Sequence, residues 1–217
     1  MNILDGVKSA ESKVSKEAIE LSKSVKDENL SLIDRIESFE DIMDIEVGDT
    51  AIKRAKNVER DLGLRQLYIK YEGDNPTGTQ KDRIAFAQVH DAIRRNYPLI
   101  SLATCGNYGV AVALAANLAG IECNILIPES YHTERVKEMA SQNANIYRLT
   151  GSYEDVVRKS SELAADHKWY DANPGGSNTP LQISAYAQIA YEIYDELRDA
   201  PKIVACPVSN GTLLAGI

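Results

Sequence analysis

From residue 67 onward, the sequence alternates between short apolar runs and longer segments with apolar residues at helical spacing. Short apolar runs are typical of strands, and stripes that repeat every three or four residues are typical of helices. The predicted strands are 67–71, 99–103, 123–127, 145–149, 168–172 and 203–208. The predicted helices between them are 83–96, 109–118, 132–142, 153–166 and 181–197. This alternation predicts an α/β fold with a mostly parallel sheet and helices on both faces.

Residues 1–45 differ from this pattern because they are rich in charge and lack strand-like runs. Apolar residues at helical spacing predict two amphipathic helices here: Val14, Ala18, Leu21, Val25, Ile33 and Ile36. We expect this segment to be an N-terminal helical extension that packs on a neighbour or on a partner subunit. The simplest interpretation is a helical surface arm.

The charge balance is mildly acidic, with 24 Lys and Arg against 32 Asp and Glu in 217 residues. No basic block or aromatic-interleaved basic patch occurs, which disfavours a nucleic-acid partner. A small anionic ligand would need a local site made of backbone N–H groups or one cation. We expect no membrane partner and a cytoplasmic location, because no signal-peptide pattern or membrane-spanning run is present.

The cysteines and histidines form neither a disulfide framework nor a metal-ligand pattern. Three cysteines are widely spaced without a CxxC pair, which favours a reducing compartment: Cys105, Cys123 and Cys206. The histidines lack ligand spacing, so we expect no metal site: His90, His132 and His167. We interpret Cys105 as a small wall residue of a turn and Cys206 as core packing within a strand.

Lys81 lies at a corner of the predicted fold, where a turn after the run 67–71 leads into a helix. The turn contains Asn75-Pro76 and Thr77-Gly78, pairs at which a chain bends tightly. A lysine at such a corner can point into a cleft and be partly desolvated, which lowers the pKa of its amine and makes it nucleophilic. An aldehyde cofactor such as pyridoxal phosphate needs such an amine.

Two further turns follow predicted strands and could bind anions. The first, Thr104 to Gly109, opens a helix, and its backbone N–H groups could bind a carboxylate. Asn107 could donate to a phenolic oxygen, or it could simply cap the helix. The second, Ser209 to Leu213, could cradle a phosphate, although an ordinary strand-to-helix turn fits equally well. In open parallel sheets, ligands bind beyond the carboxyl ends of strands, where all three segments are expected to lie.

The residues around Lys81 resemble the lysine motif N-P-T-G-[ST]-x-K-[DF]-R of the fold-type II pyridoxal-phosphate enzymes: Asn75-Pro76-Thr77-Gly78-Thr79-Gln80-Lys81-Asp82-Arg83. A second run is similar to the family's S-G-N-x-[GA] turn: Cys105-Gly106-Asn107-Tyr108-Gly109. The resemblance extends from about Val47 to the end of the sequence. It implies two open, mostly parallel, three-layer αβα domains, the second incomplete.

The resemblance also implies a role for each motif. It implies that Lys81 forms a Schiff base with pyridoxal 5'-phosphate and later moves the proton at the substrate Cα. It implies that Asn107 hydrogen-bonds the ring hydroxyl oxygen of the cofactor. The substrate α-carboxylate would bind the turn that contains Thr104, Cys105, Gly106, Asn107 and Tyr108. The cofactor phosphate would bind the loop that contains Ser209, Asn210, Gly211, Thr212 and Leu213.

Within the family, the threonine synthase branch is the most similar. Two segments carry this likeness: Ala172-Asn173-Pro174 with the helix that follows, and Cys206-Pro207-Val208-Ser209-Asn210-Gly211, which is similar to a V-P-V-G-N-G-type loop. The likeness implies a carbon–oxygen lyase that converts O-phosphohomoserine to threonine and phosphate, and it implies a homodimer. The alternative within enzymes is a β-replacement synthase that makes cysteine or cysteate.

The resemblance divides the chain into parts. Residues 1–45 form the extension, 46–65 begin the cofactor domain, 66–172 form a small α/β domain with the lysine and asparagine motifs, and 173–217 return to the cofactor domain. Family members continue beyond the phosphate loop and supply a partner for the pyridine nitrogen there. We therefore expect a fragment or one part of a split enzyme, and an inactive fragment or a regulatory α/β module is the non-enzyme alternative.

Overall fold

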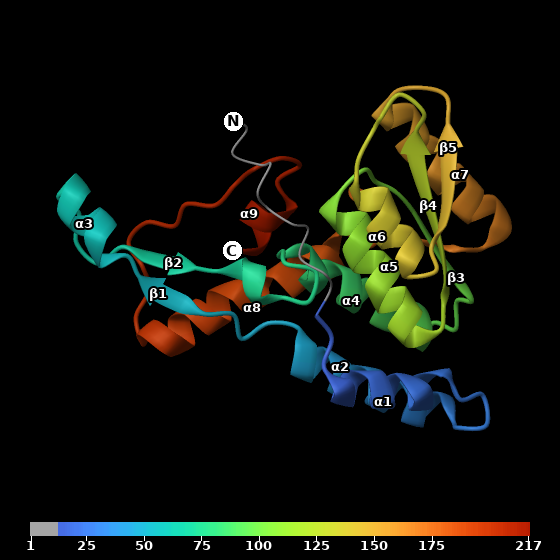
Figure 1. Cartoon of the computed structure of the whole chain (residues 1–217), viewed down its shortest axis with the longest axis horizontal. Coiled ribbons are helices and arrows are strands. Elements are labelled where there is room, and N and C mark those ends of the chain that lie inside the picture. The colour runs from blue at the N-terminus through green and yellow to red at the C-terminus, as the bar shows by residue number, and fades with distance from the viewer. Residues whose placement is uncertain (1–12) are drawn as a thin grey trace.

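A four-stranded parallel sheet organises much of the computed structural model, which describes residues 13–217 (Figure 1). Its strand order is β5-β4-β3-β6. The strands are β3 (Leu99–Ala103), β4 (Glu122–Pro128), β5 (Asn145–Leu149) and β6 (Tyr170–Asp171). All of β3 and nearly all of β4 are buried, as expected for parallel strands covered on both faces. The predicted parallel sheet is confirmed.

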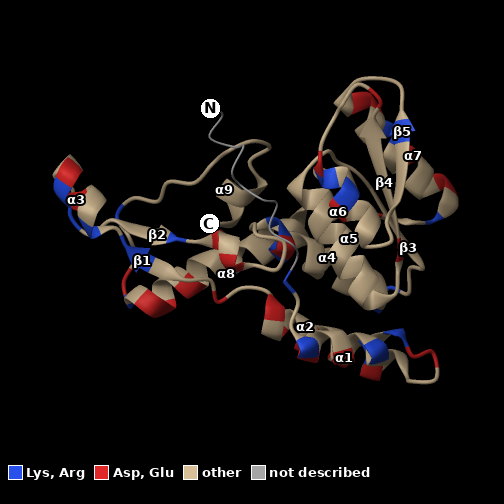
Figure 2. Cartoon of the chain, viewed as in Figure 1, with Lys and Arg blue, Asp and Glu red and all other residues tan. Residues whose placement is uncertain are grey.

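Helices cover both faces of this sheet. They are α4 (Lys81–Arg94), α5 (Asn107–Ala119), α6 (Arg135–Ser141) and α7 (Tyr153–His167). Helix α7 packs on β3 and β4 from one face, while α4 and α5 pack on the other with α6 beside α5 (Figure 1). Figure 2 shows α5 without a charged residue, because the sheet and neighbouring helices surround it.

The N-terminal segment forms two helices, α1 (Lys16–Lys26) and α2 (Leu32–Glu46), that pack on α5 and α4. Ser22 donates a buried hydrogen bond of 2.7 Å to the Leu118 carbonyl, and Phe39 stacks on Phe86. The two predicted helices are confirmed, and they join the main apolar cluster of the same chain. Ile33, placed on the apolar stripe by the sequence, is instead 67 % exposed. Residues 1–12, which the predicted extension includes, lie outside the described part.

The other half of the molecule contains a separate pair of antiparallel strands, β1 (Ile52–Arg54) and β2 (Tyr68–Lys70). Its other elements are α3 (Lys56–Leu62), the 3-10 turn η2 (Glu72–Asp74), α8 (Thr179–Leu197) and α9 (Thr212–Gly216). The run 67–71 was expected to belong to the parallel sheet, and this prediction is wrong. Its backbone pairs with β1, so Lys81 does not follow a strand of the parallel sheet.

Residues 203–208 form no strand, which corrects a second expectation. Within the described part of the chain no backbone hydrogen bond joins this segment to another strand, and Ile203 is 86 % exposed. Cys206 is only half-buried, in a segment without regular secondary structure, so the interpretation of Cys206 as core packing within a strand is wrong. The helix predicted at 181–197 is confirmed as α8 and connects the two halves by packing on α4. No helix among residues 13–217 has the length and apolar character needed to cross a bilayer.

Candidate active site

Lys81 is the first residue of α4, at the end of a tightly bonded turn. Gly78 in this turn has a φ of +82°, a conformation that favours glycine, and its N–H donates to the Asn75 carbonyl at 2.8 Å. The Asn75 side chain accepts from the Gly48 N–H at 3.1 Å and donates to the Glu72 carbonyl at 3.0 Å. These bonds hold the backbone that presents Lys81 in one conformation.

Asp82 closes the same turn from the helix side. Its buried carboxyl group accepts hydrogen bonds from the Thr77 N–H at 3.0 Å and from the Thr77 hydroxyl at 2.9 Å. Burial raises the pKa of Asp82 to about 6, and the Thr77 hydrogen bonds and the charge of Arg135 act against this rise. Asp82 thus fixes the start of α4 next to Lys81.

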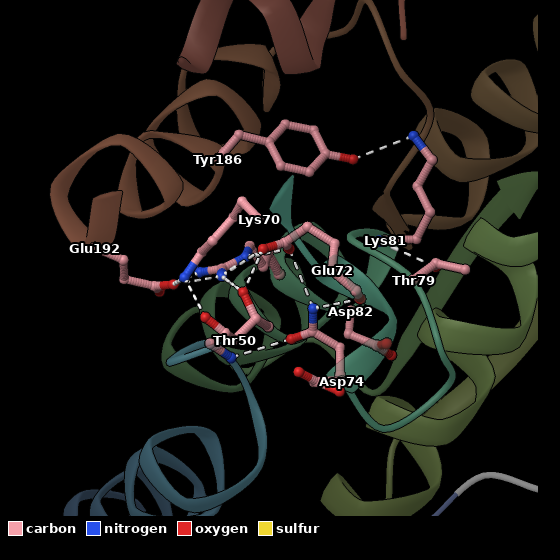
Figure 3. A network of polar contacts seen from close by, with 12 residues as sticks. Thr50, Lys70, Glu72, Asp74, Thr79, Lys81, Asp82, Tyr186 and Glu192 are labelled. Carbon is pink, nitrogen blue, oxygen red and sulfur yellow. Dashed lines mark hydrogen bonds and ion pairs between the residues drawn. The ribbon is translucent and has the colours of Figure 1, made fainter. Parts of the chain in front are cut away.

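The Lys81 amine is half-buried and donates to the Tyr186 hydroxyl at 3.1 Å (Figure 3). Its Nζ also lies 5.6 Å from the centre of the Tyr186 ring. Burial lowers the pKa of Lys81, and no carboxylate within residues 13–217 forms an ion pair with it. A lysine with these properties loses its proton more readily than a surface lysine and becomes a nucleophile.

A buried charged cluster, which we call the Arg83 cluster, lies beside this lysine: Thr50, Lys70, Glu72, Arg83 and Glu192 (Figure 3). Arg83 pairs with Glu72 at 2.7 Å and with Glu192 at 2.6 Å, and Lys70 also pairs with Glu192 at 2.6 Å. Burial alone would raise the pKa of Glu192, but the hydrogen bonds from Arg83 and Lys70 hold it at about 2. The cluster joins α4, β2, η2 and α8.

The turn at Asn107 forms the start of α5. Gly106 is the N-cap and Asn107 is the first helical residue, so the alternative interpretation of Asn107 as the helix cap is wrong. The Asn107 Oδ1 accepts from Arg135 at 2.7 Å and 3.1 Å, which leaves its Nδ2 as the donor toward a ligand. Helix α5, which begins at Asn107, packs on α4, which begins at Lys81.

Three other predicted residues of this turn have distinct environments. Thr104 is buried, and its hydroxyl lies 3.5 Å from the Gly106 N–H. Burial raises the pKa of the Cys105 thiol, which disfavours a thiolate nucleophile and fits the interpretation as a wall residue. Tyr108 points into the core and donates to the Ala172 carbonyl at 2.8 Å, so only its backbone could contact a ligand.

The loop Ser209 to Leu213 precedes the short helix α9. Ser209 and Asn210 are exposed, Gly211 has a φ of +88°, and the Asn210 Oδ1 accepts from the Thr212 N–H at 3.3 Å. No hydrogen bond in the described part of the chain joins this loop to Lys81 or to the Asn107 turn. The loop approaches Lys81 indirectly, because α9 packs on α8, which carries Tyr186.

The sequence analysis did not identify Tyr186 or Glu192 as site residues. Both lie on α8, more than 100 positions after Lys81 and Arg83, which they contact. The sequence predicted the helix that carries both residues, but a helical pattern does not show which residues of another helix its side chains contact.

Comparisons with known proteins identify the class. The family model of pyridoxal-phosphate dependent enzymes matches residues 43–217. The threonine synthase of Bacillus sp. (strain ULM1) is 33 % identical over 164 residues, which cover 75 % of this chain and 46 % of the relative. The threonine synthase of Methanocaldococcus jannaschii is 30 % identical over 172 residues, or 78 % of this chain and 42 % of the relative. The chain therefore belongs to the family of pyridoxal-phosphate dependent enzymes, and it spans less than half the length of these relatives.

Solved structures show the same fold. Cysteine synthase from Entamoeba histolytica superposes with a TM-score of 0.70 at 20 % identity, covering 97 % of this chain and 57 % of that one. The diaminopropionate ammonia lyase of Escherichia coli superposes with a TM-score of 0.67 at 19 % identity, covering 94 % of this chain and 60 % of that one. Both are fold-type II enzymes, which confirms the expected fold class.

The residues of the site fit the cofactor of this family, pyridoxal 5'-phosphate. The cofactor's aldehyde bonds to a lysine amine, and Lys81 supplies an amine with a lowered pKa at a rigid helix start. Asn107 supplies an amide donor at a neighbouring helix start.

Proposed function

We propose that this chain carries the reactive lysine of a pyridoxal-phosphate-dependent lyase similar to threonine synthase. The proposed reaction converts O-phosphohomoserine to threonine and phosphate. The proposal rests on the environment of the Lys81 amine. The amine is half-buried, and burial lowers its pKa. The turn that ends at Asp82 fixes the start of the helix that carries it. Relatives at 30–33 % identity that are named threonine synthases support the choice of branch.

Each residue would have a defined task. Lys81 would hold the cofactor covalently and, once released by the substrate amine, would accept and return the proton at the substrate Cα. Asn107 would donate from Nδ2 to the cofactor ring oxygen, and the backbone around Thr104 would bind the α-carboxylate. Ser209 to Leu213 would bind the cofactor phosphate. When bound, the cofactor supplies an electron sink for the charge that develops at Cα.

We also propose that residues 66–172 form the small domain and that 46–65 and 173–217 contribute to the cofactor domain. In this division, Lys81 and Asn107 belong to the small domain, while Tyr186 and the Ser209 loop belong to the other. The cofactor would then bind between the two, as ligands do at domain interfaces.

The proposal is tested by trapping pyridoxal phosphate on the 217-residue chain with borohydride and mapping the labelled peptide by mass spectrometry. We expect the pyridoxyl label on Lys81 at limiting reagent, because its amine is neutral at a lower pH than that of an exposed lysine. Lys81→Ala should abolish the dominant label. Lys137→Ala is the matched control, because Lys137 is 85 % exposed on α6. Label spread over exposed lysines, without preference for Lys81, would contradict the assignment.

The substrate is tested separately. Phosphate release from O-phosphohomoserine supports the threonine synthase-like reaction, whereas consumption of a sulfur nucleophile supports the β-replacement alternative. Labelling at Lys81 without either reaction would favour the non-catalytic module.

A further inference from the structure

The Lys81 amine contacts the side chain of Tyr186. Its hydroxyl lies 3.1 Å from Nζ and its ring centre lies 5.6 Å from the same atom (Figure 3). The residue is fully buried although it carries a polar group. A buried hydroxyl needs a hydrogen-bond partner, and the half-buried Lys81 amine supplies one.

The position of Tyr186 is fixed from two sides. Gln182, one helical turn earlier on α8 and also fully buried, donates to the Gln88 side chain on α4 at 3.3 Å. On the other side, α9 covers the Tyr186 backbone so closely that a Cβ added at Gly216 would lie 2.6 Å from the Tyr186 Cβ. Tyr186 therefore cannot shift without moving α4 or α9.

Among the described residues, the carboxylates near this contact have other partners and form no hydrogen bond with the Lys81 amine. Burial raises the pKa of the Tyr186 hydroxyl, and the negative charges of Glu72 and Asp82 add to that rise. Glu72 is paired with Arg83, and Asp82 accepts hydrogen bonds from Thr77. Glu192, on the same helix as Tyr186, is paired with Arg83 and Lys70.

We propose that Tyr186 is a positioning residue for the Lys81 amine and that its hydroxyl sets the direction from which Nζ meets an aldehyde. A hydroxyl can accept a hydrogen bond from the ammonium and can donate one to the neutral amine. It can therefore hold Nζ in both protonation states, but the bond to the charged ammonium is the stronger of the two, so the hydroxyl favours the protonated amine. The inference rests on the proposed function only in that Lys81 is taken as the reactive amine.

The first test measures the amine without the cofactor. Competitive acetylation of every lysine as a function of pH, followed by peptide mass analysis, gives an apparent pKa for Lys81 in the wild-type chain and in Tyr186→Phe. Phenylalanine keeps the ring and the burial but removes the hydrogen bond that favours the ammonium. We expect the apparent pKa of Lys81 to fall by about 0.5 to 1 unit, while that of Lys137 stays the same.

The matched control is Tyr191→Phe, because Tyr191 lies on the same helix and is 68 % exposed. It should leave the Lys81 titration unchanged. An unchanged pKa in Tyr186→Phe would overturn the proposal, because the hydroxyl would then not interact with the amine. A rise toward the ordinary lysine value would also overturn it, because loosened packing would then explain the result.

The second test measures orientation. The rate of borohydride-trapped labelling of Lys81 by pyridoxal phosphate, divided by the neutral fraction from the acetylation titration, should fall about tenfold in Tyr186→Phe. An unchanged corrected rate would contradict the positioning role. Failure of the cofactor to label Lys81 even in the wild-type chain would refute the proposed function, whereas the acetylation titration would still decide whether Tyr186 holds the amine.

Discussion

At the scale of single residues, the Lys81 turn depends on polar contacts that leave little freedom. Asp82 and Thr77 bond to each other through two donors, and both residues are buried. Asn75 ties the turn to Gly48 and Glu72. A reactive lysine needs this rigidity, because a displacement of its amine by about 1 Å can reduce a rate about a hundredfold.

We predict that Asp82→Ala lowers the free energy of unfolding by about 2–3 kcal/mol, because the Thr77 N–H and hydroxyl would lose their acceptor in a buried position. Urea denaturation measures the change. Asp166→Ala is the control, since Asp166 is exposed on α7, and it should change stability by less than about 0.5 kcal/mol. Equal stabilities of the two variants would show that the Asp82–Thr77 contact does not support the turn.

The sequence predicted that Lys81 lies where a turn leads into a helix, because the residues that form the turn are neighbours in the sequence. Asn-Pro, Thr-Gly and the lysine follow one another within seven positions, and the structure places them in one turn. Tyr186 could not be found in the same way, since its contact with Lys81 depends on how α8 packs on α4. Asn107 was identified correctly as a helix-start residue, but its bond to Arg135 depends on the position of α6.

At the scale of elements, the Arg83 cluster determines how α8 meets the start of α4. Glu192 receives bonds from Arg83 on α4 and from Lys70 on β2, so one carboxylate joins three elements. Removing one partner of a buried ion pair costs more than removing a surface pair, because the remaining charges stay desolvated.

We predict that Glu192→Gln lowers the free energy of unfolding by about 3 kcal/mol at neutral pH. Glu196→Gln, one turn later at the exposed C-terminal end of α8, is the matched control and should have an effect below about 0.5 kcal/mol. Urea unfolding monitored by circular dichroism checks both.

The pH dependence of this difference follows from the pKa of Glu192. Its folded value of about 2 lies below the ordinary value of 4.5, so the carboxylate stabilises the fold fully above that ordinary value. This stability is lost as the pH falls through about 2. The difference between wild type and Glu192→Gln should therefore be largest at neutral pH and shrink in acid. A constant difference would contradict the assigned ion pairs.

The elements also show which strands can be predicted from sequence. The runs 99–103 and 145–149 match β3 and β5 residue for residue. β3 is apolar and buried along its whole length, as is typical of a parallel strand covered on both faces, whereas β5 lies at the edge of the sheet and is partly exposed. The run 203–208 has the same apolar character and forms no strand. A strand needs a neighbouring strand to bond to, and the composition of a run does not show whether one is present.

At the scale of the whole molecule, the N-terminal helices belong to the same core as the parallel sheet. Ala18, Val25, Phe39 and Ile42 are fully buried and lie in the apolar cluster that contains α4, α5, β3 and β4. The periodicity of residues 1–45 predicted the two helices. It could not show whether their apolar faces cover the core or lie at the surface, because that depends on contacts with α4 and α5. The structure favours a single cooperative unit.

This cooperativity gives the last prediction. Phe39→Ala removes the ring that stacks on Phe86, and it should lower the free energy of unfolding by about 3–5 kcal/mol. Trp169, the single tryptophan, lies just before β6 and reports on the distant sheet. If the helices and the sheet unfold together, the urea midpoint from Trp169 fluorescence will shift with the midpoint from circular dichroism.

Ile33→Ala is the control on the same helix, since Ile33 is largely exposed, and it should leave both midpoints nearly unchanged. A Phe39→Ala variant in which only the circular dichroism midpoint moves would show that α1 and α2 unfold as a separate arm. In that case the buried contacts of Phe39 would stabilise the arm locally, and the lysine turn on α4 would not depend on them. A joint shift would instead mean that the N-terminal helices support the helix that presents Lys81.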